Sequence, residues 1–439
     1  MIGGSKVSSH SEVIFPKTLK IPGGQAPKGV VRVSGAKNSG TRLLAAASLT
    51  DENVVLTNFP TKLVDAQHKI RFLREVGFSI DVDYETEELH LSGGVITSEV
   101  LDSYDYPIRT TYLLVAAQIV RNGVAKIPYP GGCKIGSRGY DLHILVWEAL
   151  GCEVKELPDY IEVSGEFMGG TIDFPISTVG GTENALLCGA VAAGTTVIHN
   201  AYITPEVSDL ISMLRHMGAE IKVTGNSYIE IQGKSGLLSG VHMPVMPDRI
   251  EALTWIVLAI LTGGELLIED VPFEHMEIPL LHLKDAGIDI FRNSTSAYIT
   301  PDCLRSTGIQ PFEVACGTHP GVISDMQPFY VLLAMNAMGI SRVYDYRYPK
   351  RIGYVDELAK FYPGAFSSEE GCITIKGGMR GKAATAESTD LRGSMAVIMA
   401  AMMTEGDSTI NDAHMALRGY NDLLGKLEKV GINVEAVYG

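Results

Sequence analysis

The stretch AQHKIRFLREVGFSIDV, residues 66–82, contains the unit from which the fold is predicted to be built. Its apolar residues follow the 3.6-residue period of an amphipathic helix: Ala66, Ile70, Leu73 and Val76. Gly77 follows them directly, as glycine often does at a helix C-terminus. Residues 78–82 then alternate between apolar and polar, which indicates a strand. The stretch therefore predicts a helix, a glycine and a strand.

The same unit recurs six times along the chain. Each copy has an amphipathic helix, a glycine and a short alternating strand, although the fifth copy is weaker. The glycines are spaced 67 to 77 residues apart: Gly77, Gly151, Gly218, Gly287, Gly364 and Gly431. A fixed spacing of this kind indicates an array of one supersecondary unit.

Each unit also contains a second predicted helix that is nearly uncharged on every side, which is typical of a buried helix. These helices are expected at residues 39–49, 110–120, 184–193, 252–262, 326–338 and 393–404. Each repeat then reads as βαβαββ, and six repeats favour an α/β fold of two domains with three repeats each. We expect domain I at 17–36 plus 247–439, domain II at 37–246, and a flexible tail at 1–16.

Composition narrows the class of protein. The 439 residues are 46% hydrophobic and 20% charged, as in a globular protein with more than one core. The net charge of −15 argues against a nucleic-acid partner. Six cysteines without metal-ligand spacing indicate free thiols and a cytoplasmic location. The apolar stretches are too short to span a bilayer, and no signal peptide is recognised, so no membrane partner is expected.

A glycine-rich loop, PGGCKIGSRGYDLH at residues 130–143, places one thiol between cations. Lys134 and Arg138 would favour the thiolate of Cys133 and could hold an anion. The loop glycines allow the backbone to approach a ligand closely. The pattern favours a reactive cysteine, and the alternative is an ordinary free cysteine in a surface loop.

Charged residues gather where the predicted buried helices begin. Helix N-termini carry unpaired N–H groups and partial positive charge, and they bind phosphate and carboxylate. Three acids there fit either a function or simple helix capping: Glu183, Asp325 and Asp390. Capping does not explain the cations, which are disfavoured at that end of a helix: Lys37, Arg109 and Arg392. If the six N-termini face one cleft, this acidic protein contains a local anion site.

Six motifs, in this order, resemble those of the enolpyruvyl transferases, and within that family the branch that acts on nucleotide sugars. They are SGAKN (34–38), the 130–143 loop, VGGTEN (179–184), HPG with SDMQ (319–321 and 324–327), DLRGS (390–394) and RGY (418–420). The resemblance covers roughly residues 18–438. It implies two inside-out α/β domains that close on a cleft, in agreement with the repeats.

The resemblance implies transfer of the enolpyruvyl group of phosphoenolpyruvate to the 3-hydroxyl of UDP-N-acetylglucosamine, with release of phosphate. The reaction would pass through a tetrahedral addition–elimination intermediate and begin peptidoglycan synthesis. The implied partners are small-molecule substrates, with no cofactor and no metal. A monomer or weak homo-oligomer is expected.

The resemblance also implies roles for individual residues. Lys37, Arg138 and Arg418 would face the phosphate of phosphoenolpyruvate. Arg347 and Arg392 would face its carboxylate, and Arg109 would be a further arginine of the site. The implied acceptor-binding residues are Asn38, Arg138, Asp141, Leu142, Val179 and Gly180. Val343 and Asp390 are further residues expected to bind substrate.

Two further roles concern proton transfer. Cys133 resembles the loop cysteine that takes part in proton transfer at C3 and in product release, and that the antibiotic fosfomycin alkylates. Asp325 resembles the base that takes the proton of the sugar 3-hydroxyl, for which a carboxylate is suited.

Several assignments have alternatives. Arg351 competes with Arg347 as the carboxylate ligand, since both lie in the charged turn 345–351. Arg418 begins a predicted surface helix and could simply be exposed. His143 and His319 fit structural roles better than acid roles. The remaining cysteines are interpreted as fillers of the apolar interior: Cys152, Cys188, Cys303, Cys316 and Cys372.

Four segments depart from the family pattern, and all are expected near the acceptor. They are Gly139-Tyr140 in place of Pro-Val, Val322-Ile323-Ser324 in place of aromatic-Pro-Thr, Ser39-Gly40 in place of alanines, and the turn around Arg347. Another nucleotide acceptor, such as UMP, therefore stays open. So does a non-catalytic homologue that binds a nucleotide sugar. Shikimate 3-phosphate and an RNA-end-processing activity fit less well, because of the Cys133 loop and the negative charge.

Overall fold

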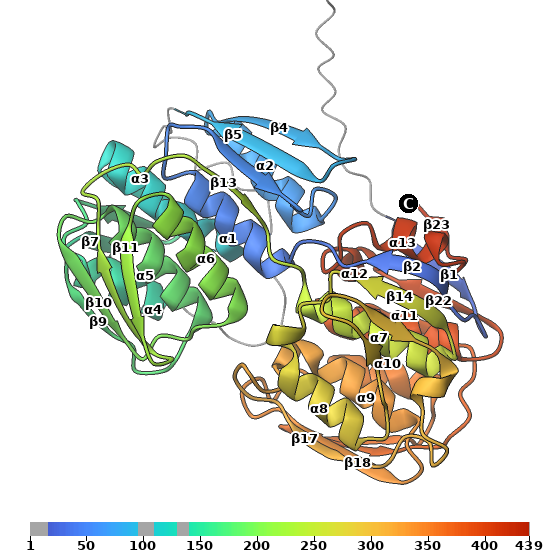
Figure 1. Cartoon of the computed structure of the whole chain (residues 1–439). Helices are drawn as coiled ribbons and strands as arrows, with labels where there is room; N and C mark the ends of the chain where they lie inside the picture. Colours follow the sequence, from blue (N-terminus) through green and yellow to red (C-terminus); the bar gives the residue numbers. More distant parts are fainter. Residues whose placement is uncertain (1–15, 95–108, 130–139, 439) are drawn as a thin grey trace, which may run out of the picture.

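The computed structural model describes residues 16–94, 109–129 and 140–438 (Figure 1). Cys133 and Arg138 lie outside these residues. Of Arg109, only the backbone, at the start of η2, is described. Among the described helices, none combines the length and the apolar character that a membrane span needs.

Within the described residues, the predicted repeats appear as six small sheets. Three lie in the middle of the chain: β13(Val241–Pro244)-β3(Val54–Thr57)-β5(Glu88–Ser92)-β4(Ser79–Asp83), β6(Val124–Pro128)-β8(Tyr160–Ser164)-β7(Glu153–Glu156), and β11(Glu220–Thr224)-β12(Tyr228–Gln232)-β10(Thr195–His199)-β9(Thr171–Asp173). Three contain the C-terminal strands: β15(Phe291–Arg292)-β16(Ala297–Ile299)-β14(Glu265–Glu269)-β2(Lys28–Arg32), β17(Glu313–Ala315)-β18(Ile340–Tyr344)-β20(Cys372–Lys376)-β19(Phe366–Glu369), and β21(Thr385–Glu387)-β22(Asp407–Asn411)-β1(Thr18–Pro22)-β23(Glu435–Val437).

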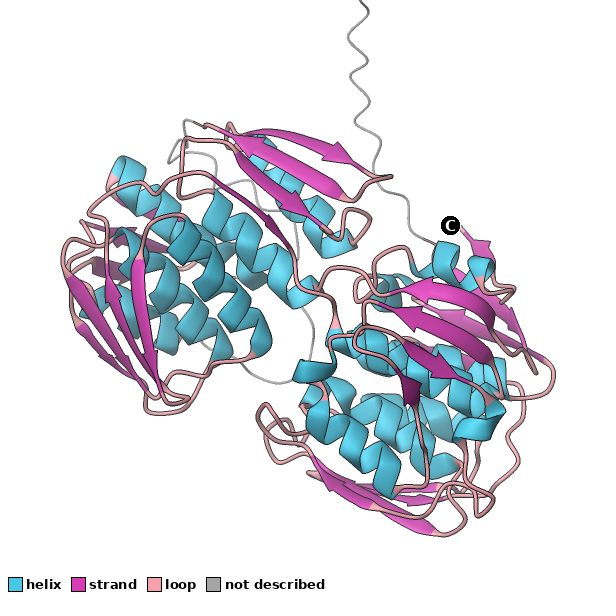
Figure 2. Cartoon of the chain, viewed as in Figure 1, coloured by secondary structure: helices cyan, strands magenta, loops and turns pink. Residues whose placement is uncertain are grey.

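Helices occupy the space between the sheets, as Figure 2 shows. The six apolar helices are α1(Lys37–Ala47), η2(Arg109–Leu114) with α3(Val115–Asn122), α5(Val179–Val191), α7(Arg249–Thr262), η5(Ser324–Met326) with α9(Gln327–Met335), and α11(Leu391–Met403). The six amphipathic helices are α2(Val64–Glu75), α4(Asp141–Ala149), α6(Pro205–His216), α8(Glu277–Asp285), α10(Gly353–Phe361) and α13(Leu423–Lys429). Three short elements complete the set: η3(Phe273–His275), η4(Pro301–Cys303) and α12(His414–Leu417).

The six repeat glycines all have positive φ, between 80° and 112°. An L side chain is strained in that region, so glycine is required where each amphipathic helix turns into its following strand. The six apolar helices lie within a few residues of their predicted ranges. The repeat prediction is therefore confirmed in both of its parts.

Two hydrophobic cores organise the chain. Core I combines residues between 19 and 33, together with Val64, with residues between 250 and 432, and core II is formed by other residues between 43 and 245. The first two strands explain the discontinuity of core I: β2 pairs in parallel with β14, and β1 pairs antiparallel with β22. We call the surroundings of these cores half I and half II; Figure 1 shows them on either side of the segments that link them.

The linking segments run side by side. Gly35 forms a bridge with Pro247, and the Ala36 N–H donates to the Met246 carbonyl at 2.7 Å. A Cβ on Gly35 would lie 1.9 Å from the carbonyl oxygen of Asn58, so only glycine fits here. The positions of these two linking segments agree with the predicted domain limits near residues 36 and 247. The division into these two domains stays a proposal.

Candidate active site

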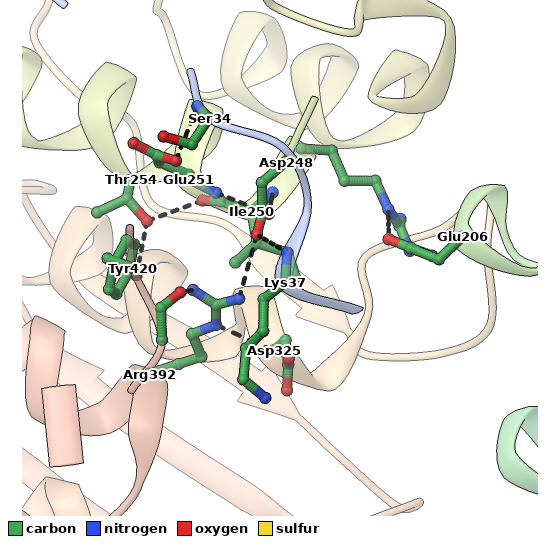
Figure 3. A network of polar contacts seen from close by, with 12 residues as sticks. Ser34, Lys37, Glu206, Asp248, Ile250, Glu251, Thr254, Asp325, Arg392 and Tyr420 are labelled. Carbon is green, nitrogen blue, oxygen red and sulfur yellow. Dashed lines mark hydrogen bonds and ion pairs between the residues drawn. The ribbon is translucent and has the colours of Figure 1, made fainter. Parts of the chain in front are cut away.

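The beginnings of four helices meet where half I approaches α1. Asp248 caps α7 by accepting from the N–H groups of Ile250 at 2.8 Å and Glu251 at 3.1 Å. Its other oxygen accepts from the N–H of Lys37, the first residue of α1, at 3.3 Å. Figure 3 shows Lys37, Asp248, Asp325 and Arg392 grouped around this point. The predicted gathering of charges at helix N-termini is thus seen for α1, α7, α9 and α11.

Asp325 is the carboxylate at the centre of this group. Arg351 Nη1 lies 2.8 Å from Asp325 Oδ1, and Arg392 Nε lies 3.8 Å from Asp325 Oδ2. Burial alone would raise the pKa of Asp325, but the charges of Arg351, Arg392 and Lys37 hold that pKa well below its usual range. The Asp325 side chain is 30% exposed, against 2% for both arginines. It is therefore an ionised carboxylate that can reach a ligand.

The Arg392 side chain is held in place by residues of the RGY motif. Its Nη1 donates to the carbonyl of Gly419 at 2.9 Å, and its guanidinium carbon lies 4.8 Å from the centre of the Tyr420 ring. Burial lowers the pKa of Arg392, but its interactions with the Tyr420 hydroxyl and with the carboxylates of Asp248 and Asp325 outweigh burial and raise it. Arg392 is therefore a permanently charged, rigid cation at the start of α11.

A second carboxylate, Asp65, was missed by the sequence reasoning. It lies in the first turn of α2, 3.2 Å from Lys37 Nζ and 2.8 Å from Arg418 Nε. Burial would raise its pKa, but the charges of Lys37 and Arg418 lower it. The available signal was the pair Asp65 and Lys69, polar residues four apart beside the apolar stripe of α2.

The placement of Arg418 corrects the prediction that it begins a surface helix. Arg418 follows the short helix α12, and its side chain is only 12% exposed. The ion pair with Asp65 joins half I to half II. The predicted helix start was wrong because α12 ends at Leu417 and the next helix, α13, begins only at Leu423.

The two candidate carboxylate ligands take different places. Arg351 is buried between Asp325 and Asp390, with Nη2 at 2.7 Å from Asp390 Oδ1. Arg347 reaches half II, where Nη2 donates to the Ser177 carbonyl at 2.9 Å and the guanidinium lies 5.3 Å from the Tyr202 ring centre. The structure therefore brings Arg351 to Asp325, whereas Arg347 contacts the segment before α5.

Residues expected at the nucleotide lie at the starts of α4 and α5. Val179 and Gly180 open α5 after the cap Thr178, which accepts from the Gly181 N–H at 3.2 Å. A Cβ on Gly180 would lie 2.7 Å from the Tyr112 hydroxyl, so a side chain would clash there. Asp141 and Leu142 open α4, and Asn38 is the second residue of α1, half-buried.

The aromatic rings near α4 explain His143. It is buried, and its ring centre lies 3.8 Å from that of Tyr112. Tyr140, one of the departures from the family, meets the rings of Tyr129 at 5.9 Å and His143 at 6.0 Å. His143 thus has the packing of a structural histidine.

Other predicted residues lie elsewhere. Val343 belongs to β18 in core I and is fully buried, so it offers no surface to a substrate. His319 is half-buried, and burial together with the charge of Arg249 lowers its pKa to about 4. Four of the cysteines interpreted as fillers are buried, and Cys372 is half-buried.

The three acids predicted at helix starts take different roles in the structure. Asp390 caps α11 by accepting from the N–H groups of Arg392 and Gly393, both at 3.2 Å. Glu183 is not a cap: it lies inside α5, paired with Arg42 Nε at 2.9 Å, because Thr178 already caps that helix. Asp325 makes no capping bond in η5 and faces the arginines instead.

Comparison with known proteins agrees with this architecture. The family profile of EPSP synthase (3-phosphoshikimate 1-carboxyvinyltransferase) matches residues 21–427. The UDP-N-acetylglucosamine 1-carboxyvinyltransferase of Zymomonas mobilis is 35% identical over 96% of this chain and 99% of its own length. The enzyme of that name from Myxococcus xanthus is 33% identical over 95% and 98%.

Solved structures show the same fold. The enolpyruvyl transferase NikO of Streptomyces tendae superposes with a TM-score of 0.84 at 24% identity, covering 96% of this chain and 99% of NikO. EPSP synthase of Acinetobacter baumannii gives 0.71 at 19% identity, covering 95% and 99%. The chain belongs to the enolpyruvyl transferase family and is a transferase with that family's α/β fold.

Proposed function

We propose that this protein transfers the enolpyruvyl group of phosphoenolpyruvate to the 3-hydroxyl of UDP-N-acetylglucosamine and releases phosphate. The observation that carries the proposal is the accessible, ionised Asp325 carboxylate beside Lys37 and Arg392 at converging helix N-termini. The names of the most similar curated relatives support the choice of acceptor. The reaction would supply the first committed intermediate of peptidoglycan synthesis.

Each group has a task in this reaction. Lys37 and Arg418 would hold the phosphate, and Arg392 with Arg347 would hold the carboxylate. Proton addition to C3 makes C2 electrophilic, and the acceptor oxygen attacks C2 while Asp325 takes the hydroxyl proton. Loss of phosphate and of one C3 proton from the tetrahedral intermediate gives the enol ether. Preorganised cations stabilise the anionic groups throughout.

The test is phosphate release from phosphoenolpyruvate with UDP-N-acetylglucosamine, UMP or shikimate 3-phosphate offered separately. We expect release with UDP-N-acetylglucosamine. Release with shikimate 3-phosphate instead would contradict the proposed acceptor. If none of the three acceptors supports phosphate release, the enzymatic proposal would be contradicted and a nucleotide-sugar-binding homologue would be favoured.

A second acceptor class has a specific observation in its favour. Tyr140 adds an aromatic ring, in contact with Tyr129 and His143, at the start of α4, where the nucleotide is expected. Aromatic rings stack on nucleobases with useful energy, about 1–3 kcal/mol per base. Release with UMP alone would favour this second candidate.

The role proposed for Cys133 gives a separate prediction. Replacement Cys133→Asp should abolish covalent inactivation by fosfomycin but keep measurable turnover, because an aspartate can also carry a proton. Mass spectrometry after incubation with fosfomycin reads the adduct directly. Cys372→Ser is the matched control and should be alkylated like the parent protein. An adduct on Cys133→Asp would overturn the assignment.

A further inference from the structure

Arg351 lies at the end of the turn 345–351, one of the segments that depart from the family pattern. We propose that Arg351 is a positioning residue for the transfer reaction: it fixes the Asp325 carboxylate against the start of α11 through Oδ1 and so orients Oδ2 toward the acceptor. This inference rests on the proposed function, because it concerns the base of that reaction.

Two ion pairs join three side chains in a row: Asp325, Arg351 and Asp390. Arg351 Nη1 binds Asp325 at 2.8 Å, and Arg351 Nη2 binds Asp390 at 2.7 Å. Asp390 is itself fixed, because it accepts from two N–H groups at the start of α11. The orientation of the base is therefore tied through one guanidinium to a helix N-terminus.

Exposure separates the roles of the two partners. The Arg351 side chain is 2% exposed and the Asp325 side chain 30%. Both terminal nitrogens of Arg351 are engaged by carboxylates, Nη1 by Asp325 and Nη2 by Asp390, whereas Asp325 keeps accessible surface. Arg351 therefore acts on the acceptor through Asp325.

The turn that carries Arg351 is itself anchored. The buried Asp345 accepts from the N–H groups of Arg347 at 3.2 Å and Tyr348 at 3.0 Å. The N–H of Arg351 then donates to the Tyr348 carbonyl at 2.9 Å. Behind Arg351, α10 packs closely on α11, since a Cβ on Gly393 would lie 2.6 Å from the Tyr354 Cβ. The guanidinium is thus held by the fold before any substrate arrives.

The charges facing Asp325 come from several elements. Arg351 lies before α10, Arg392 on α11 and Lys37 on α1, while the carboxylates of Asp390 and Asp248 share these arginines. After desolvation, the charge of Arg351 has the largest influence on the pKa of Asp325, and it lowers that pKa. Without Arg351, burial and the Asp390 carboxylate would push that pKa upward.

The experiment compares Arg351→Met and Arg351→Lys with the parent enzyme over pH 4 to 9, using the acceptor that supports turnover. For Arg351→Met we expect kcat to fall about 100-fold. The acidic limb of the kcat profile, which for the parent lies below pH 4, should move up toward or into the measured range. The KM for phosphoenolpyruvate should change less than about threefold. Arg351→Lys should restore part of both the rate and the acidic limb. Arg342→Met, which removes the exposed pair with Glu313, is the matched control and should behave as the parent.

Two results would overturn the proposal. A lower kcat with an unmoved acidic limb would mean that Arg351 has a structural role only. A raised KM for phosphoenolpyruvate with kcat retained would mean that Arg351 binds the substrate carboxylate. If Arg351→Met does not fold, the rate and pH profile of Arg351→Lys decide between these outcomes.

A readout without turnover separates this proposal from the proposed function. Aspartates labelled with ¹³C at the carboxyl carbon are titrated by NMR, and Asp325→Asn assigns the Asp325 signal. Asp325 should stay ionised to lower pH in the parent than in Arg351→Met or Arg351→Lys. Identical titration in all three would overturn the role of Arg351 even if the parent proved inactive with every acceptor.

Discussion

Two carboxylates, Asp325 and Asp65, each lie between two cations, but they belong to different parts of the molecule. Asp325 is bound from within half I, by Arg351 at 2.8 Å and Arg392 at 3.8 Å. Asp65 is bound from both halves, by Lys37 at 3.2 Å and Arg418 at 2.8 Å. Exposure differs as well, since the Asp325 side chain is 30% exposed and that of Asp65 10%.

The difference indicates a division of labour. Both arginines paired with Asp325, the proposed base, come from half I. Lys37 and Arg418, which we propose hold the phosphate, come from different halves, and both pair with Asp65. Asp325 should therefore govern the chemical step, and Asp65 the capture of phosphoenolpyruvate.

The largest expected effect comes from Asp325→Asn, which keeps the shape of the side chain and removes its basicity. We expect kcat to fall about 10²- to 10⁴-fold, while the KM for phosphoenolpyruvate changes little. Steady-state phosphate release measures both constants. Asp289→Asn, in an exposed pair with Arg305, is the control and should change neither constant. Equal losses in binding and turnover would indicate that Asp325 is structural.

A smaller effect is expected from Asp65→Asn, and it concerns the KM for phosphoenolpyruvate more than kcat. Lys37 and Arg418 lose the carboxylate that orients them, so the KM for phosphoenolpyruvate should rise about tenfold, or about 1.4 kcal/mol, with a smaller change in kcat. Steady-state phosphate release again measures both constants. Asp422→Asn removes the more exposed pair with Lys62 and serves as the control. A fall in kcat that matches Asp325→Asn would erase the distinction between the two carboxylates.

The smallest effect is the acid dependence of stability. The pKa of Asp65 is lowered, mainly because the charges of Lys37 and Arg418 overcome burial. A carboxyl with a lowered folded-state pKa stabilises the fold above its unfolded pKa, near 4, and loses that contribution as the pH falls below this value. Urea unfolding between pH 7 and pH 3 should therefore show a shallower acid loss for Asp65→Asn than for the parent. A parallel loss in both would argue that the pair contributes nothing to stability.

The sequence predicted the periodic parts of the molecule well. Gly77 and its five counterparts have the expected backbone conformation, because the turn from helix to strand is a local requirement. The helices α1 and α11, whose starts carry Lys37 and Arg392, also begin close to their predicted positions. Periodicity and capping act within a few residues, so both are readable from the chain.

The residue pairs that form the site were harder to predict from the sequence. Asp65 meets Arg418 across 353 positions of sequence, a contact that no local pattern encodes. Arg351 and Arg347 were both plausible from their turn, and only the packing of α10 on α11 sets Arg351 between Asp325 and Asp390. The short helix α12, which ends before Arg418, depends likewise on tertiary contacts.

The most direct test of the central claim is the structure of the product. The enzyme is incubated with phosphoenolpyruvate labelled with ¹³C at C2 and with UDP-N-acetylglucosamine, and the ¹³C spectrum is recorded as phosphate accumulates. We predict that the label appears in an enol ether on the sugar 3-oxygen, with one phosphate released per product. A label that stays in phosphoenolpyruvate, or leaves it without joining the sugar, would contradict the account.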